Sequence, residues 1–163
     1  MKNYFFRHLI LIGHSTGAID AALYAHKDRR ITQLILTGAV SDLKNAAHYD
    51  FTDEQVRDFW TKGYIFYDRP GKWMHGKKLK KAFYDEFFTL DIPTAIKKYK
   101  KPLLIVHGEK DIIPASEPQA LFTMANTPKK LVIIRGADHS FTEAEHFKKV
   151  LKVMGEFVEK RFI

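Results

Sequence analysis

A short apolar run leads directly into the sequence Gly-His-Ser-Thr-Gly, and this junction restricts the fold more than any other feature of the chain. The apolar run covers residues 9–12, and the pentapeptide covers residues 13–17. A helix-compatible stretch follows, so the segment predicts a strand, a tight turn and a helix in direct succession. In a G-x-S-x-G turn the serine hydroxyl is held exposed at the end of the strand. Gly13 and Gly17 lack a Cβ, which lets strand and helix pass close together. Ser15 is therefore the first candidate for a reactive side chain.

The composition fits one globular domain over residues 1–163. Of the 163 residues, 45% are hydrophobic and 28% are charged, which is enough for a sizeable core. The chain has no cysteine, which excludes disulfides and thiolate metal sites and fits a cytoplasmic protein. Residues 1–8 do not resemble a signal peptide, because Arg7 and His8 interrupt their apolar run. No apolar run approaches the roughly 18 residues of a membrane span, so we expect no membrane partner.

The chain is basic, with a formal net charge of +8, and many of its lysines lie in residues 72–81 and 97–101. Binding to nucleic acid therefore has to be considered. A nucleic-acid binder would show salt-sensitive binding that depends on Lys77, Lys78, Lys80 and Lys81. No RNA- or DNA-binding motif accompanies these lysines, so we expect no nucleic-acid partner. We interpret the lysines as a solvated face, with attraction of anionic substrates as the second interpretation.

Strands alternate with helices over most of the chain. Apolar segments predict strands at residues 8–12, 31–37, 103–107 and 131–134, and helices are predicted at 15–26, 116–125 and 142–161. Capping-box patterns, Ser116 with Gln119 and Thr142 with Glu145, open the last two helices. This alternation indicates βαβ units and a mainly parallel α/β sheet of about four strands flanked by helices.

Residues 41–100 have a different character and are interpreted as an insertion that contains most of the aromatic side chains. Thr52 and Gln55 form a capping-box pattern. The predicted elements are a helix opening at that box and running to residue 60, a hairpin of 64–67 and 72–75 around a turn at 68–71, and helices over 77–90 and 93–99. The aromatic residues either form the insertion's own small core or, for a few of them, line an apolar pocket.

An exposed serine becomes a nucleophile when a base takes its proton and an acid orients the base. In an open parallel sheet, functional groups gather at the carboxyl ends of strands. Asp111 follows the third predicted strand and His139 follows the fourth, which gives the order Ser15, Asp111, His139. Glu109 and Asp138 are the competing carboxylates.

Three segments together resemble the α/β-hydrolase-fold serine hydrolases. They are Gly-His-Ser-Thr-Gly at 13–17, Val-His-Gly-Glu-Lys-Asp at 106–111 and Gly-Ala-Asp-His-Ser-Phe at 136–141. The order serine, aspartate, histidine is the order of that fold. The resemblance implies that Ser15 attacks an acyl carbonyl, that His139 moves its proton and that Asp111 orients His139. It also implies that the Thr16 backbone N–H donates to the oxyanion and that no cofactor is needed.

The resemblance places the acid at Asp111 rather than Glu109, and Asp138 is expected to make a local hydrogen bond or cap. His14 and His107 are expected to be structural residues. The other histidines considered, His26, His48, His75 and His146, show no metal-ligand spacing, so we expect no catalytic metal.

The resemblance covers the C-terminal part of the fold, so the sequence looks like an α/β hydrolase truncated at its N-terminus, with residues 41–100 in the place of a cap. The cap is similar, more weakly, to that of cinnamoyl and feruloyl esterases. The loop that donates the second oxyanion N–H would be missing, and loss of one such donor costs about 10²–10³-fold in rate. The strand at residues 9–12 would be an exposed apolar edge, so we expect a homo-oligomer that covers it.

The predicted function is hydrolysis of a small carboxylic ester through an acyl-serine intermediate. The alternative is a catalytically impaired or inactive hydrolase that acts as an interaction module. Truncation of a longer hydrolase, dimerisation and a non-catalytic remnant all fit the sequence. The motifs do not choose among ester, thioester, amide and peptide substrates.

Overall fold

The structure is a computed structural model that describes residues 8–68, 70–71, 74–126 and 128–160. The chain forms two compact units. The larger unit consists of Met1–Asp42 and Asp91–Ile163, and the inserted unit consists of Leu43–Leu90.

The larger unit is built on one parallel sheet. Its strands are β1 (Leu9–His14), β2 (Ile31–Thr37), β5 (Leu103–Gly108) and β6 (Lys129–Ile134), in the order β1-β2-β5-β6. Every neighbouring pair in this sheet is parallel, which confirms the predicted four-stranded sheet. All six residues of β5 are buried, as expected for a central strand covered on both faces.

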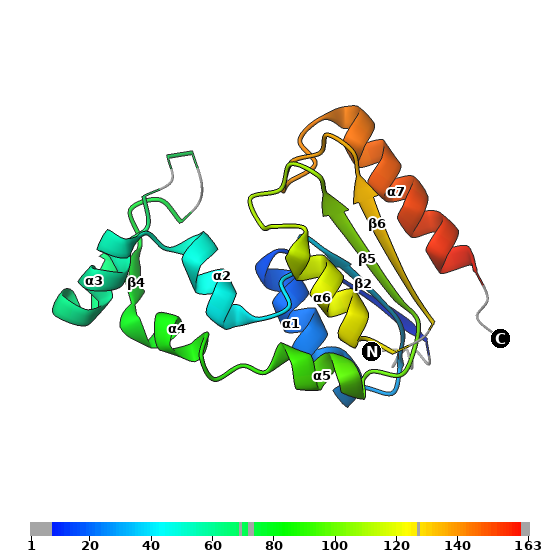
Figure 1. The fold of residues 1–163 in the computed structure, drawn as a ribbon, viewed down its shortest axis with the longest axis horizontal. Helices are drawn as coiled ribbons and strands as arrows, with labels where there is room; N and C mark the ends of the chain where they lie inside the picture. Colours follow the sequence, from blue (N-terminus) through cyan, green and yellow to red (C-terminus); the bar gives the residue numbers. More distant parts are fainter. Residues whose placement is uncertain (1–7, 69, 72–73, 127, 161–163) are drawn as a thin grey trace, which may run out of the picture. The chain divides into compact units, whose positions relative to one another are not determined.

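Helices cover both faces of the sheet (Figure 1). Helix α7 (Ala144–Glu159) packs on one face, where its Val150 and Phe157 join a core with Ile35, Leu104 and Val106 of the sheet. The helical segments on the other side are α1 (Thr16–Tyr24), a 3₁₀ turn η1 (Ala25–Lys27), α5 (Ile92–Lys98) and α6 (Ser116–Met124). The strand register aligns His14 with Thr37 and Gly108 with Ile134, so the carboxyl ends of the strands meet at one edge.

The inserted unit has its own small aromatic core, as one of the two interpretations of its sequence predicts. Its elements are α2 (Leu43–Asp50), α3 (Asp53–Lys62), β3 (Tyr64–Phe66), β4 (Lys78–Lys80) and α4 (Lys81–Glu86). The rings of Phe51, Phe59 and Phe87 are buried, and Phe51 meets the other two edge to face. Tyr84 stacks on Phe59 with 5.1 Å between ring centroids.

Two predictions for the inserted unit are wrong. The second hairpin strand is β4 (Lys78–Lys80), which pairs antiparallel with β3, and not residues 72–75, of which 72 and 73 lie outside the described residues. The helix predicted over 77–90 is reduced to α4 (Lys81–Glu86), because its first residues are used in that pairing. Helix α2 was not predicted.

The three capping boxes have different outcomes. The box of Thr52 and Gln55 is confirmed, with both reciprocal hydrogen bonds present. The boxes at Ser116 and Thr142 are wrong, since the N-caps are Ala115 and Glu143 and neither makes a side-chain capping bond. The Thr142 hydroxyl instead donates to Asp138, so it is not available to cap the helix.

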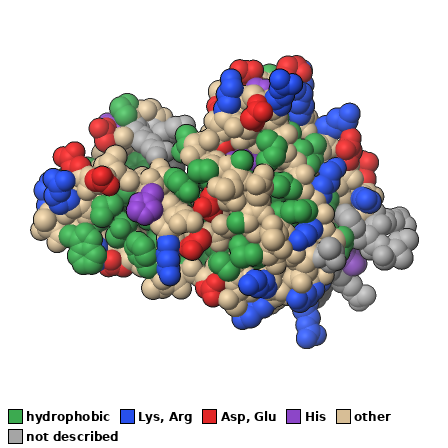
Figure 2. Space-filling view, viewed as in Figure 1, with side chains coloured by type: hydrophobic (Ala, Val, Ile, Leu, Met, Phe, Trp, Pro, Cys, Tyr) green, Lys and Arg blue, Asp and Glu red, His purple; other side chains and the backbone are tan. Residues whose placement is uncertain are grey.

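Several lysines of the basic segments have structural contacts. Lys78 lies 3.8 Å from the centre of the Tyr64 ring, and Lys81 lies 3.8 Å from that of Trp60. Lys101 donates to the backbone carbonyls of Arg29 and Ile31. On the face seen in Figure 2, basic side chains stand among acidic ones. Within the described ranges, no helix is long and apolar enough to cross a membrane.

Candidate active site

Ser15 lies on a strained turn between β1 and α1. Its backbone has φ 54° and ψ −123°, a left-handed φ that non-glycine residues rarely adopt. A backbone hydrogen bond to the neighbouring strand β2 stabilises the turn: the Ser15 N–H donates to the Thr37 carbonyl at 3.0 Å. A Cβ on Gly13 would collide with the Gly17 carbonyl and with Ala18. Gly13 therefore permits the close approach of strand and helix.

Gly17 does not have the role that the sequence suggests. A Cβ at this position would meet no atom within 4 Å. The close passage of strand and helix depends on the absence of a side chain at Gly13 alone.

His139 joins the serine to a carboxylate. Its Nε2 lies 2.9 Å from the Ser15 hydroxyl oxygen, and its Nδ1 lies 2.8 and 2.9 Å from the two oxygens of Asp111. A carboxylate only accepts, so Nδ1 carries the proton and donates to Asp111. Nε2 is then free to accept the serine proton. The three side chains form a continuous hydrogen-bonded series from Ser15 to Asp111.

The side chain of Asp111 is fully buried and firmly held. The Ile113 N–H donates to its Oδ1 at 2.8 Å. Burial opposes ionisation, but the hydrogen bonds from His139 and Ile113 and the charges of His139 and His107 outweigh it. They hold the pKa of Asp111 below its ordinary value. The carboxylate therefore stays ionised at neutral pH.

The two competing carboxylates are engaged elsewhere. Glu109 accepts from the Gly136 N–H at 2.8 Å. Asp138 accepts from the backbone and the hydroxyl of Thr142, which confirms the expected local hydrogen bonding. Among the described carboxylates, Asp111 is the one that meets His139.

Two further residues frame the imidazole. A Cβ on Gly38, which has φ 55°, would lie 2.7 Å from Cε1 of His139, so the ring fits against a bare backbone. The His14 ring lies 5.0 Å from that of His139, and its Nδ1 bonds to the Thr37 hydroxyl at 2.9 Å. Burial, and then the charge of His139, lower the pKa of His14. The position of Gly38 directly after β2 is the signal that could have pointed to it.

Thr16 is the first residue of α1, directly after the serine. Backbone N–H groups in the first turn of a helix have no partner within the helix, and the positive end of the helix dipole lies there. The Thr16 N–H is thus placed to donate to a negatively charged oxygen formed beside Ser15.

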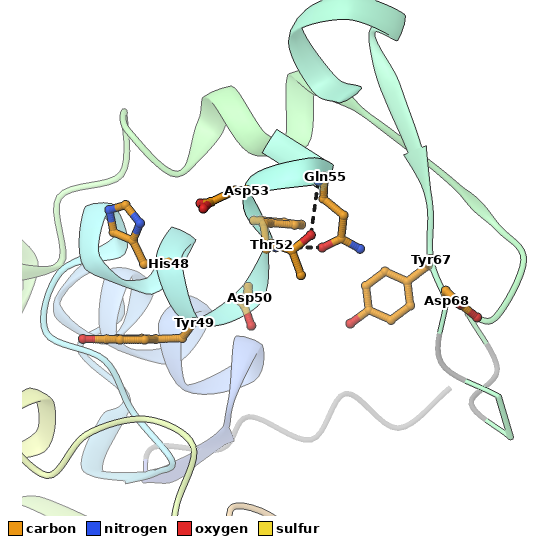
Figure 3. Close-up of a pocket in the computed structure, with 9 residues that line it drawn as sticks. His48, Tyr49, Asp50, Thr52, Asp53, Gln55, Tyr67 and Asp68 are labelled. Atoms are coloured by element: carbon orange, nitrogen blue, oxygen red, sulfur yellow. Dashed lines mark hydrogen bonds between the residues drawn. The ribbon is translucent and has the colours of Figure 1, made fainter. Parts of the chain in front are cut away.

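The inserted unit contains a cavity of about 520 Å³ (Figure 3). Its lining residues are His48, Tyr49, Asp50, Phe51, Thr52, Asp53, Gln55, Tyr67 and Asp68. Three of these are aromatic residues of the set that the sequence offered for an apolar pocket, but most of the lining is polar.

No protein-family model matches the chain, and no curated protein sequence matches it. Solved structures do match. The esterase domain of a Rhodothermus marinus protein has a TM-score of 0.66 and 22% identity, over 91% of this chain and 59% of that chain. The α/β hydrolase GrgF from a Penicillium species has a TM-score of 0.69 and 17% identity, over 97% and 66% of the two chains.

The protein Est1E from Butyrivibrio proteoclasticus matches with a TM-score of 0.71 and 25% identity, over 98% of this chain and 65% of that chain. A second structure of Est1E, with ferulic acid bound, matches at 26% identity. The chain thus has the α/β-hydrolase fold, as its motifs predict, and spans 59 to 65% of the length of the esterase domain and Est1E.

Proposed function

We propose that this protein is a serine hydrolase that cleaves carboxylic esters through an acyl-serine intermediate. The observation that carries the proposal is the hydrogen-bonded series Ser15, His139, Asp111 at the carboxyl edge of the sheet. The similarity to an esterase domain and to Est1E supports the ester as the substrate class.

The chemistry follows from the geometry. His139 Nε2 takes the Ser15 proton as the serine oxygen attacks the ester carbonyl, and the same nitrogen then returns the proton to the departing alcohol. Water then attacks the carbonyl of the acyl-serine, His139 Nε2 takes a proton from it, and the same proton returns to the Ser15 oxygen as the acid departs. Asp111 stabilises the imidazolium that forms each time and fixes the tautomer of the ring. The Thr16 N–H stabilises the oxyanion.

Turnover of p-nitrophenyl acetate and butyrate tests the proposal, with methyl ferulate as a third substrate because ferulic acid binds Est1E. We expect turnover by the natural chain and its loss in Ser15→Ala. The pKa of Asp111 lies below its ordinary value, so protonation of this carboxylate should cause no loss of activity around neutral pH. Equal rates for the natural chain and Ser15→Ala would refute the proposal.

A matched pair of carboxylate variants tests the role of the acid. Asp111→Asn should lower kcat by about 10⁴-fold, because an amide stabilises the wrong tautomer of His139. Glu109→Gln removes a nearby carboxylate that contacts Gly136 and should leave kcat within a few-fold. A fluorophosphonate probe should label Ser15 in the natural chain. Absence of labelling would favour an inactive interaction module.

A further inference from the structure

A buried segment directly after β2, residues 38–41, lies against the ring of His139. A Cβ on Gly38 would lie 2.7 Å from Cε1 and 3.0 Å from Nδ1 of His139, so the imidazole packs closely against the Gly38 backbone. All residues of 38–41 are buried, and none of them belongs to a helix or a strand. The position of the imidazole therefore depends on a stretch of backbone that regular secondary structure does not hold.

Hydrogen bonds hold this segment at both of its ends. At the start of the segment, the Gly38 N–H donates to the Val106 carbonyl of β5 at 3.2 Å. At its other end, Oε2 of Glu117 accepts from the Ser41 N–H at 2.8 Å and from the Ser41 hydroxyl at 2.6 Å. The first bond joins two backbone groups, whereas the contact at Ser41 depends on a single side chain, that of Glu117.

Glu117 is buried, with 4% of the residue exposed to solvent. A buried carboxylate is costly unless hydrogen bonds replace its contacts with water. The two donors of Ser41 supply such bonds. Glu117 also lies in the first turn of α6, where the positive end of the helix dipole favours a negative side chain. Its carboxylate is therefore held in one place and can in turn hold the backbone at Ser41.

The helix that carries Glu117 is also connected to the acid of the triad. The loop after β5 carries Asp111 and leads directly into α6, which begins at Ser116. Within this loop the Ile113 N–H donates to Asp111 at 2.8 Å, and the Glu117 N–H donates to the Pro114 carbonyl at 3.0 Å. Glu117 thus links the loop that holds the acid to the segment against which the imidazole packs.

We propose that Glu117 is a positioning residue of the active site, which fixes segment 38–41 and thereby the place of the His139 ring in the triad. Glu117 acts through the backbone of this segment and takes no part in proton transfer. The inference rests on the proposed function, because the triad gives the position of the ring its meaning. It adds a residue on α6 to the residues on which the rate of the reaction depends.

A pair of variants of the full chain tests the proposal by kinetics. Glu117→Leu removes the acceptor but leaves a side chain of similar size. Its kcat for p-nitrophenyl butyrate, counted per folded molecule, should fall by about 10- to 100-fold with KM nearly unchanged, because a misplacement of about 1 Å can cost ~10²-fold in rate. The rate constant for fluorophosphonate labelling should fall by a similar factor. Glu117→Gln keeps an acceptor oxygen at the same place and should recover both rates to within a few-fold.

Proton NMR tests the position of the ring without any need for turnover. The proton between His139 and Asp111 should give a strongly deshielded signal in the natural chain, assigned by its absence in His139→Gln. The signal should shift or disappear in Glu117→Leu and return in Glu117→Gln. A natural chain that gives the signal but turns over no ester would refute the proposed function, and the Glu117 variants would still test the positioning role through the signal.

Asn126→Ala is the matched control for a merely structural effect. The Asn126 amide also joins two parts of the larger unit, since it donates to the carbonyls of Lys97 and Tyr99. It lies just before β6, at the edge of the sheet opposite the triad. The variant should unfold at lower urea concentration than the natural chain, as Glu117→Leu should, but keep the natural kcat per folded molecule and the natural NMR signal.

Two results would overturn the proposal. One is a folded Glu117→Leu variant with the natural kcat and the natural signal, and the other is an equal loss of kcat in Asn126→Ala. If Glu117→Leu does not fold, Ser41→Ala decides, because it removes the hydroxyl that donates to Glu117. Ser41→Ala should slow labelling by a few-fold and shift the signal, and unchanged values of both would equally overturn the proposal.

Discussion

The two glycines of the elbow look equivalent in the sequence but have different surroundings. Gly13 faces the backbone of α1, whereas Gly17 faces open space. The pattern G-x-S-x-G predicts that both are needed for the same steric reason. The structure gives the two glycines different roles, because the steric requirement at each position depends on the direction of its Cα–Cβ bond. The residue types in the motif do not specify that direction.

We expect Gly13→Ala to destabilise the protein by about 3 kcal/mol, since its methyl group would collide with backbone that cannot move aside cheaply. Gly17→Ala should be neutral or stabilise by about 0.5 kcal/mol, because alanine loses less conformational freedom in a helix. Urea denaturation of both variants measures the difference. Equal destabilisation by the two substitutions would contradict this account of the elbow.

The site residues themselves were predictable because each follows a predicted strand. Ser15, Asp111 and His139 are brought within hydrogen-bond distance by the parallel register, which aligns the carboxyl ends of the strands. The contacts of His14 and His107 with this series were not predictable, because the sequence suggested only structural roles for them. Their positions depend on side-chain orientation at the ends of β1 and β5.

At the scale of elements, the sequence predicts the strands of the larger unit better than the ends of its helices. The bounds of β2 agree with the prediction. Strand β1 differs from it by one or two residues at both ends, and β5 and β6 differ by one or two residues at one end each. A capping box needs a specific backbone geometry at the N-cap as well as the right residue types. Thr52 has an extended backbone at its helix start, whereas Ser116 already lies inside α6.

This difference gives a prediction for two hydroxyl residues with the same apparent motif. Thr52→Ala should lower the stability of the unit that contains α3 by about 1 kcal/mol, because the N–H of Gln55 loses its acceptor. Ser116→Ala should change stability by less than about 0.5 kcal/mol, since Ser116 makes no capping bond. Chemical denaturation followed by circular dichroism compares the two. A larger effect at Ser116 would show that the assigned caps are wrong.

The hairpin of the inserted unit illustrates why short elements escape sequence analysis. Asp68 and Pro70 favour a tight turn, so the sequence predicts that the returning strand follows directly after them. The chain instead continues to Lys78 before it pairs with β3. Three-residue strands carry too little periodicity to fix their register, so contacts within the unit decide it.

At the scale of the whole molecule, one face of β1 is apolar, and none of the described helices covers it. Gly13 points toward α1, so the alternation of side chains directs Ile10 and Ile12 to the opposite face of the sheet. Ile12 pairs in register with Ile35, which is fully buried in the core beneath α7. Ile12 itself is 55% exposed and Ile10 is 43% exposed. Helix α7 therefore covers β2 but not β1.

We propose that this face of β1 supports self-association. Among the described strands, β1 pairs only with β2, so no described strand occupies its other edge, and an unpaired strand edge is a site where a second chain can pair. Sedimentation velocity should detect a dimer or larger species at concentrations of tens of micromolar and above. Ile12→Lys should weaken this species at least tenfold, because a charge would be buried in the contact.

The control for this prediction is a lysine at an equally exposed apolar position elsewhere. Ile112 is 60% exposed and lies in the loop after β5, so Ile112→Lys adds the same charge without touching β1. It should leave the sedimentation profile unchanged. A stable monomer at high concentration in the natural chain would end the proposal. An equal effect of both lysines would assign the association to net charge, because β1 would then have no special role.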